Sequence, residues 1–120
     1  MMSVSIVSEL TPEEKKLMEA IKKELELAIK TGKIKYGYRN TLRALHKGDA
    51  KIVIIARNIP KDMKAVIAYL SALGNVPIVF FPGNAKELGE ACKRPHIISS
   101  LVILDPGTSQ IMKYGKILQL

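Results

Sequence analysis

The chain contains little cysteine and no long apolar run. Cys92 is the only cysteine among 120 residues, so no internal disulfide bond can form. Because the sequence also has no signal-peptide or transit-peptide pattern, we expect a reducing, cytoplasmic compartment. The apolar runs, such as the one at 52–56, are far shorter than the ~18 residues that a membrane-spanning helix needs. These features predict a soluble protein with no membrane partner.

Carboxylates are also scarce, which argues against an enzyme. After residue 29 the only acidic side chains are Asp49, Asp62, Glu87, Glu90 and Asp105. Asp62 and Glu87 fall in predicted first turns of helices, where the helix dipole favours a negative charge, and Asp105 begins a proline-glycine turn. Since no set of acidic and basic groups converges, we predict neither catalysis nor a bound cofactor.

Metal and nucleotide sites lack their usual patterns. Cys92 and His96 are four residues apart, but Pro95 lies between them and no second Cys/His pair exists to complete a tetrahedral site. Gly83 and Gly89 are not followed by the Gly-Lys-Ser/Thr of a phosphate loop. We therefore expect no metal, and we predict that Cys92 is a buried structural thiol.

The charge that is present is unevenly distributed. The first 29 residues carry four Lys/Arg and six Asp/Glu, whereas the rest carries fifteen and five, which gives the net charge of +8. A sequence pI near 9.7 favours a polyanionic partner, either nucleic acid or an anionic membrane surface. No predicted helix has the bulky apolar face opposite Lys/Arg that membrane-surface binding needs, so RNA is the favoured partner.

Strand and helix patterns alternate along the chain. A capping box at Thr11 and Glu14 begins a helix that ends near Gly32, and Asn84 with Glu87 begins a short helix in the same way. The expected helices are 12–31, about 40–47, a third that Asn58 and Pro60 introduce and Gly74 ends, and 84 to about 92. The expected strands are 33–36, 50–58, 77–81 and 101–104. Alternating segments with buried strands predict an α/β fold, a three-layer α/β/α sandwich with a four-stranded mixed sheet and helices on both faces.

Residues 32–48, "GKIKYGYRNTLRALHKG", form the most basic part of the sequence. They contain five Lys/Arg and no carboxylate. Gly37 allows close approach of a partner to the backbone, while Arg39, Asn40 and Arg43 lie where a helix begins and its N–H groups face outward. The Asn40 amide can hydrogen-bond base edges or merely cap the helix, whereas the lysines can only contact phosphate.

Two longer stretches, "TGKIKYGYRNTLRALHKGDAKIVIIARN" and "PGNAKELGEACKRPHIISSLVILDPG", resemble the L30e family of ribosomal proteins from the large subunits of archaea and eukaryotes. The resemblance covers about residues 25–111, with the glycine turn, the "ELG" and the "DPG" in register. It implies membership of the wider L7Ae group, small α/β/α proteins that bind kink-turns, which are sharply bent internal loops of RNA flanked by sheared G·A pairs.

The resemblance also implies which residues contact RNA. The turn and the start of the second helix would contact the G·A pairs, and Lys33 and Lys35 the adjacent phosphates. The loop at 94–99 would pack His96 and Ile98 on a base splayed out of the bend. The full expected set is Lys33, Lys35, Gly37, Tyr38, Arg39, Asn40, Arg43, Lys47, Arg94, His96, Ile97 and Ile98.

One departure from the L7Ae pattern favours the ribosomal branch. Tyr38, Arg39 and Asn40 stand where L7Ae-type proteins have an Asn-Glu pair, so the carboxylate that would accept from guanine is missing. The resulting hypothesis is a non-enzymatic constituent of the large ribosomal subunit that binds ribosomal RNA at a kink-turn or similar bent element. The alternatives are a free-standing kink-turn protein of a small ribonucleoprotein particle and a small cytosolic enzyme.

The hypothesis has consequences for partners and organisation. We expect ribosomal RNA and neighbouring large-subunit proteins as partners, and a monomer when the protein is free. We also expect one RNA-binding domain over residues 1–120, with residues 1–10 as a flexible N-terminal extension.

Overall fold

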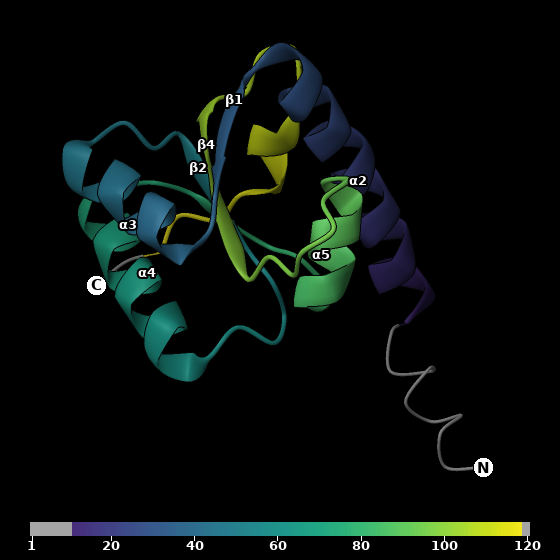
Figure 1. Cartoon of the computed structure of the whole chain (residues 1–120), viewed down its shortest axis with the longest axis horizontal. Helices are drawn as coiled ribbons and strands as arrows, with labels where there is room; N and C mark the ends of the chain where they lie inside the picture. The colour runs from purple at the N-terminus through teal and green to yellow at the C-terminus, as the bar shows by residue number, and fades with distance from the viewer. Residues whose placement is uncertain (1–10, 119–120) are drawn as a thin grey trace.

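The computed structural model describes residues 11–118, and the N-terminal extension expected at 1–10 lies outside them (Figure 1). The described elements, in chain order, are α2 (Pro12–Thr31), β1 (Lys33–Tyr36), α3 (Tyr38–Lys47), β2 (Ile52–Ile55), α4 (Lys61–Leu73), β3 (Ile78–Phe80), α5 (Ala85–Ala91), β4 (Ser100–Asp105) and the 3₁₀ helix η1 (Ile111–Tyr114). Within residues 11–118, no helix is both long enough and apolar enough to cross a membrane.

Both predicted capping boxes are present. The Thr11 hydroxyl oxygen accepts from the Glu14 N–H (3.1 Å), and the Glu14 carboxylate accepts from the Thr11 N–H (3.0 Å). Asn84 and Glu87 form the same reciprocal pair at the start of α5, with distances of 2.9 and 2.8 Å. Side chains therefore satisfy first-turn backbone donors of α2 and α5, as the sequence predicted.

The start of α3 differs from the prediction. The helix begins at Tyr38, with Gly37 as N-cap, and not near Asn40. The Gly37 carbonyl accepts from the Thr41 N–H (3.0 Å) and from the Thr41 hydroxyl (2.8 Å). Thr41 is fully buried, and its two bonds to Gly37 place the N-cap three residues earlier than a cap at Asn40 would.

The four strands form one mixed sheet in the order β1-β4-β2-β3. Strand β4 is antiparallel to both of its neighbours, and β2 and β3 are parallel. Strand β2 lies inside the sheet, between β4 and β3, and is shorter than the predicted 50–58. Figure 1 shows α3 and α4 on one face of the sheet and α2 and α5 on the other.

Two apolar cores lie on the two faces, as the alternation within β2 illustrates. Ile52 and Ile54 belong to the core beneath α2 and α5, whereas Val53 and Ile55 belong to the core beneath α3 and α4. All four side chains are almost completely buried. The three-layer sandwich predicted from sequence is confirmed, because adjacent strand residues point to opposite faces.

Several loops lie at the same edge of the sheet because of its topology. Strand β4 runs antiparallel to β1 and β2, and β3 runs parallel to β2, so β1, β2 and β3 all run in one direction. The helices α3, α4 and α5 follow these strands and begin at that edge, where the loop before β4 also lies. Residues 37–39 and 94–99 are thereby brought to one place although more than fifty positions separate them.

Candidate nucleic-acid interface

Gly37 has a backbone conformation that is essentially restricted to glycine. Its φ is 95° and its ψ is 160°, a region in which other residues are strained. A Cβ added at Gly37 would meet no heavy atom within 4 Å. The requirement for glycine is therefore conformational, and the space in front of the turn is open to a partner.

No acidic side chain in the first turn of α3 offsets the partial positive charge at this end of the helix. Of the four α-helices in residues 11–118, α3 alone has no acidic residue in its first turn, and Gly37 offers no side-chain cap. The first N–H groups of a helix have no intrahelical acceptor, and the helix dipole favours a negative group there. The start of α3 is thus suited to an anion such as phosphate.

Asn40 lies within this first turn and supports it. Its side-chain amide donates to the Tyr36 carbonyl (2.9 Å), so Asn40 does not act as the N-cap that the sequence allowed as the alternative. The Gly37 N–H donates to the Ser100 carbonyl (2.9 Å). Together these bonds fix the connection from β1 to α3 against the start of β4.

A basic hollow lies on one side of this connection. Its volume is about 180 Å³, and four predicted RNA-binding residues line it together with one carboxylate and two apolar residues. The lining residues are Lys35, Asn40, Arg43, Ala44, Lys47, Asp49 and Leu104. The structure therefore brings one positive group from β1 next to two from α3.

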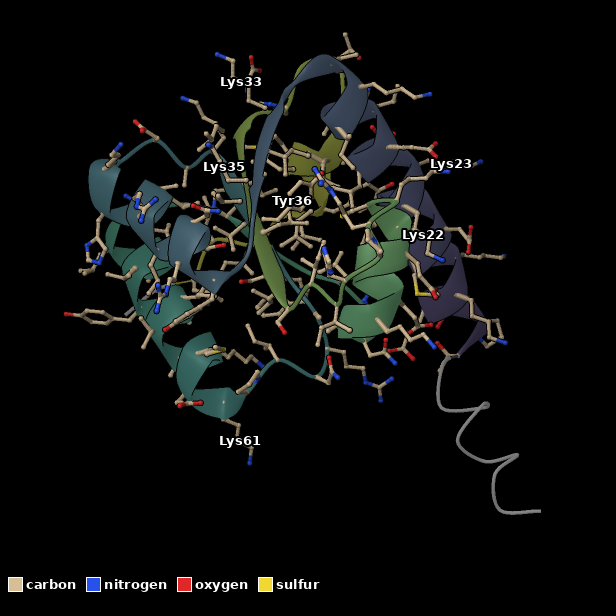
Figure 2. The ribbon with its side chains drawn as sticks, in the orientation of Figure 1. Lys22, Lys23, Lys33, Lys35, Tyr36 and Lys61 are labelled. Atoms are coloured by element: carbon tan, nitrogen blue, oxygen red, sulfur yellow. The ribbon has the colours of Figure 1, made fainter. Side chains whose placement is uncertain are left out.

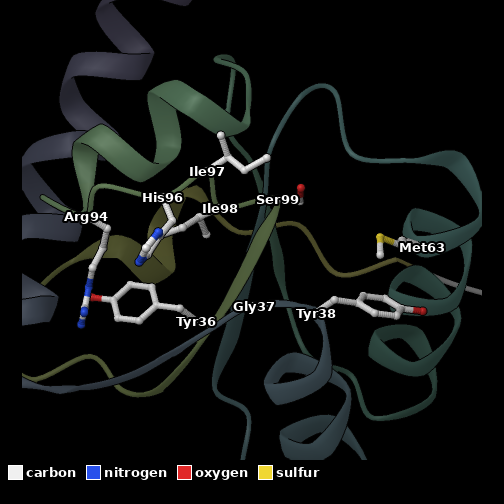
Figure 3. A pocket seen from close by; sticks show the side chains of 9 residues that line it. All are labelled: Tyr36, Gly37, Tyr38, Met63, Arg94, His96, Ile97, Ile98 and Ser99. Atoms are coloured by element: carbon white, nitrogen blue, oxygen red, sulfur yellow. The ribbon is translucent and has the colours of Figure 1, made fainter.

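An apolar groove lies on the other side of Gly37 and has a volume of about 350 Å³ (Figure 3). Tyr36 packs against the α2/α5 core, while Tyr38 and Met63 pack against the α3/α4 core, so the groove spans the edge of the sheet. Six predicted site residues line it, along with Tyr36, Met63 and Ser99, which were not in the predicted set. The six are Gly37, Tyr38, Arg94, His96, Ile97 and Ile98.

The three additional residues differ in how far sequence could reveal them. Ser99 lies in the predicted loop at 94–99, and Tyr36 ends the predicted strand at 33–36. The aromatic ring of Tyr36, next to the turn glycine, was therefore a usable signal. Met63 comes from α4 and carried no signal, because its position beside Tyr38 depends on how α3 packs against α4. Figure 3 shows Tyr36 and Tyr38 on opposite sides of Gly37, with Met63 facing Tyr38.

The loop between α5 and β4 is held close to α5. The Arg94 N–H donates to the Gly89 carbonyl (3.0 Å), and the Ile98 N–H donates to the Ala85 carbonyl (3.0 Å). A Cβ on Gly89 would collide with the His96 carbonyl oxygen. Gly89 lies inside α5, as predicted, and its function is to let the loop backbone approach the helix.

The two isoleucines of this loop have different environments. Ile97 is 69% exposed, whereas Ile98 is 6% exposed and belongs to the α2/α5 core. Ile98 therefore forms part of the groove wall, and Ile97 offers apolar surface to solvent. Of the two, Ile97 is the side chain with a face free for a partner.

Two predicted residues line neither hollow. Lys33 is exposed at the start of β1, opposite Asp105 of β4, and Arg39 is exposed in the first turn of α3. Figure 2 shows Lys33 and Lys35 along β1, with Tyr36 near its end. The predicted set thus divides into the basic hollow, the apolar groove and these two exposed cations.

Cys92 is buried, as predicted, with 3% of its surface exposed. Burial raises the pKa of its thiol to about 12, and the nearby positive charge of Arg94 offsets this only in part. Among residues 11–118, no group of three or more His, Cys, Asp or Glu side chains could hold a metal ion. The thiol stays protonated at neutral pH, so it is poorly suited to act as a nucleophile.

Comparison with known proteins identifies relatives along most of the chain. The model of the ribosomal protein L7Ae/L30e/S12e/Gadd45 family matches residues 19–113. A protein of Pyrobaculum calidifontis is 48% identical over 93 residues, covering 78% of this chain and 92% of the relative. One of Pyrobaculum neutrophilum is 46% identical over 96 residues (80% and 95%), and one of Methanopyrus kandleri is 35% identical over 95 residues (79% and 87%). All three relatives are named large ribosomal subunit protein eL30.

Proposed function

The chain belongs to the ribosomal protein L7Ae/L30e/S12e/Gadd45 family, and from that premise we propose that it is a structural protein of the large ribosomal subunit. We further propose that it binds ribosomal RNA at a kink-turn or a similarly bent element. Relatives named large ribosomal subunit protein eL30, at 35–48% identity over more than three quarters of the chain, support the first part.

The observation that carries the second part is the arrangement around Gly37. An apolar groove lies on one side of the turn and a basic hollow on the other. Bent RNA presents both of the matching chemistries, since its phosphates crowd together at the bend and its unstacked bases expose flat apolar faces. A straight duplex offers phosphates but no splayed base, so it would use only the basic hollow.

The proposed roles follow from the environment of each residue. Lys33, Lys35, Arg43 and Lys47 contact phosphates, because their cations face solvent in or beside the basic hollow. The open Gly37 turn admits the RNA backbone or a base edge, and the adjacent Arg39 and Asn40 contact it. Tyr38, Arg94, His96, Ile97 and Ile98 form the groove for the splayed base.

The proposal also covers activity, partners and location. The protein acts by holding RNA in a bent shape and not by catalysing a reaction. Its partners are ribosomal RNA and neighbouring proteins of the large subunit, it is a monomer when free, and it works on the cytoplasmic ribosome.

Crosslinking in cells, followed by sequencing of the attached RNA, tests this proposal directly. We expect large-subunit ribosomal RNA at the crosslink, and co-sedimentation of the protein with large subunits in a gradient. Crosslinks to a small RNA and sedimentation near the top would favour the free-standing kink-turn protein. Purified native protein without any crosslinkable RNA would contradict both RNA-binding hypotheses.

A further inference from the structure

Tyr36 contacts both segments of the candidate interface, although it belongs to neither. Its carbonyl accepts the Asn40 side-chain amide (2.9 Å), which ties it to the first turn of α3. Its ring lies beneath the guanidinium of Arg94, whose central carbon is 4.4 Å from the ring centroid. Figure 3 shows the Arg94 guanidinium next to the Tyr36 side chain, with His96 beside Arg94.

The loop that carries Arg94 is attached to α5 near its two ends. On the α5 side it is held by two backbone hydrogen bonds, one at Arg94 and one at Ile98. Between them Pro95, His96 and Ile97 are exposed. The Tyr36–Arg94 stack adds a contact from the exposed side of the loop to the end of β1, and therefore to the Gly37 turn across the groove.

We propose that Tyr36 is a positioning residue for RNA recognition: its backbone fixes the Gly37 turn, and its ring, through Arg94, fixes the loop at 94–98 at the distance from that turn which a splayed base requires. This inference rests on the proposed function. It assigns Arg94 to the support of the loop, through its stacked face, and not to neutralisation of a phosphate.

Energetics favour this role for a pair at the surface, in which Arg94 is exposed and Tyr36 is half-buried. A single cation–π contact at the surface is weak compared with folding, but this one acts directly on the spacing of the two segments. A site whose parts are already correctly spaced loses less conformational freedom on binding. The stack should therefore matter more for binding kinked RNA than for the stability of the fold.

The test compares Tyr36→Leu, which removes the ring, with the matched control Tyr36→Phe, which keeps it. We expect Tyr36→Leu to weaken binding of a kink-turn RNA about two- to fivefold, the change in Kd that corresponds to losing a surface cation–π contact of about 0.5–1 kcal/mol. Tyr36→Phe should bind like the unmodified protein, and a straight duplex should bind all three equally. Thermal unfolding identifies any general loss of stability in the leucine variant.

Arg94→Met supplies an independent arm, since it removes the cation from an exposed position. It should weaken kink-turn binding as much as Tyr36→Leu does, and the double variant should be no weaker than either single variant. The salt dependence should be unchanged. If Arg94→Met instead lowers the log–log salt slope by about 0.7–0.9 while Tyr36→Leu has no effect, Arg94 contacts phosphate and the inference is overturned.

A measurement without RNA separates this inference from the proposed function. Ring currents of Tyr36 should shift the NMR signals of the Arg94 side-chain protons upfield, and Tyr36→Leu should abolish the shift while Tyr36→Phe retains it. An unshifted Arg94 in the free protein would overturn the positioning role. Failure of even the unmodified protein to bind kinked RNA would count against the proposed function, whatever the NMR result.

Discussion

The helices α3 and α5 begin at the same edge of the sheet, but their first turns are built in opposite ways. At α5, Asn84 and Glu87 cap the helix with their own side chains and place a carboxylate at its positive end. At α3, the cap is a glycine, and the first turn has no acidic residue but includes the cation Arg39. One helix start is satisfied by the protein itself, and the other is available to an anionic partner.

The difference lies in the capping residues. A helix start that its own side chains cap has a structural role, whereas a helix start without a side-chain cap is a candidate for binding an anion. A carboxylate at N3 contributes to helix stability but would repel phosphate. Omitting it at α3 forgoes that stabilisation and leaves the N–H groups accessible. The following substitutions test this comparison, in order of their expected effect on RNA affinity.

Gly37→Val should have the largest effect. A β-branched residue is strained at φ 95° and ψ 160°, which should lower the free energy of unfolding by about 1–3 kcal/mol. Its side chain would also project into the open space in front of the turn, so kinked RNA should lose affinity by more than about tenfold, or 1.4 kcal/mol. Chemical denaturation and filter binding measure the two effects.

Gly48→Val is the matched control for strain. Gly48 also has a positive φ, of 79°, and no atom within 4 Å of an added Cβ, but it lies at the other end of α3. It should destabilise the fold without a comparable loss of kinked-RNA affinity in the folded fraction. Equal losses of affinity in both variants would mean that Gly37 acts only through stability.

Asn40→Ala should come second. It leaves net charge unchanged and should cost kinked RNA about 1–3 kcal/mol, while binding to straight RNA is spared. Because the amide also donates to the Tyr36 carbonyl, about 1 kcal/mol of stability should be lost as well. Parallel titrations with both RNAs decide the matter, since equal losses would leave Asn40 with a purely structural role.

Lys35→Ala should weaken kinked and straight RNA alike, because a phosphate contact carries no information about shape. For the unmodified protein we expect a log–log salt slope steeper than roughly −2, and the variant should make it shallower by about 0.7–0.9. Titrations at several salt concentrations provide both values. A loss of affinity for kinked RNA alone would contradict this and would mean that Lys35 recognises the shape of the RNA.

Asn84→Ala should have the opposite effect to the substitutions at the start of α3, namely a loss of stability without a loss of RNA affinity. Loss of the N-cap should reduce stability by about 1 kcal/mol, but RNA affinity should not change, because α5 supplies no free helix start to the interface. Denaturation and binding measured on one preparation test this. A loss of RNA affinity in fully folded protein would remove the distinction between the two helix starts.

Cys92→Ala should have no effect on RNA binding, and a tenfold loss would show that the thiol does more than fill the core. The raised pKa predicts a pH effect on stability instead. The buried neutral thiol stabilises the fold fully below the ordinary pKa of 9.0, and this contribution is lost as pH rises toward about 12. The stability difference between the unmodified protein and the alanine variant should therefore shrink over that pH range.

Several features of this protein follow from the sequence alone. The capping boxes at Thr11 and Asn84, the apolar periods of the helices and the alternation of strand and helix depend on residues a few positions apart. Such local interactions can be predicted from the spacing of residues in the sequence. They were sufficient for the three-layer fold, for the buried state of Cys92, and for locating the basic stretch at residues 32–48.

Only the tertiary structure decided how the candidate site is assembled. From the sequence, α3 was expected to begin at about Asn40, whereas the helix begins at Tyr38, because Gly37 is its N-cap and accepts two hydrogen bonds from the buried Thr41. The sequence also could not distinguish exposed Ile97 from buried Ile98, or bring Met63 beside Tyr38 and Arg94 onto the Tyr36 ring. These relations join segments distant in the chain, and they exist only once the sheet order and the packing of helices on both faces have set the spacing between them.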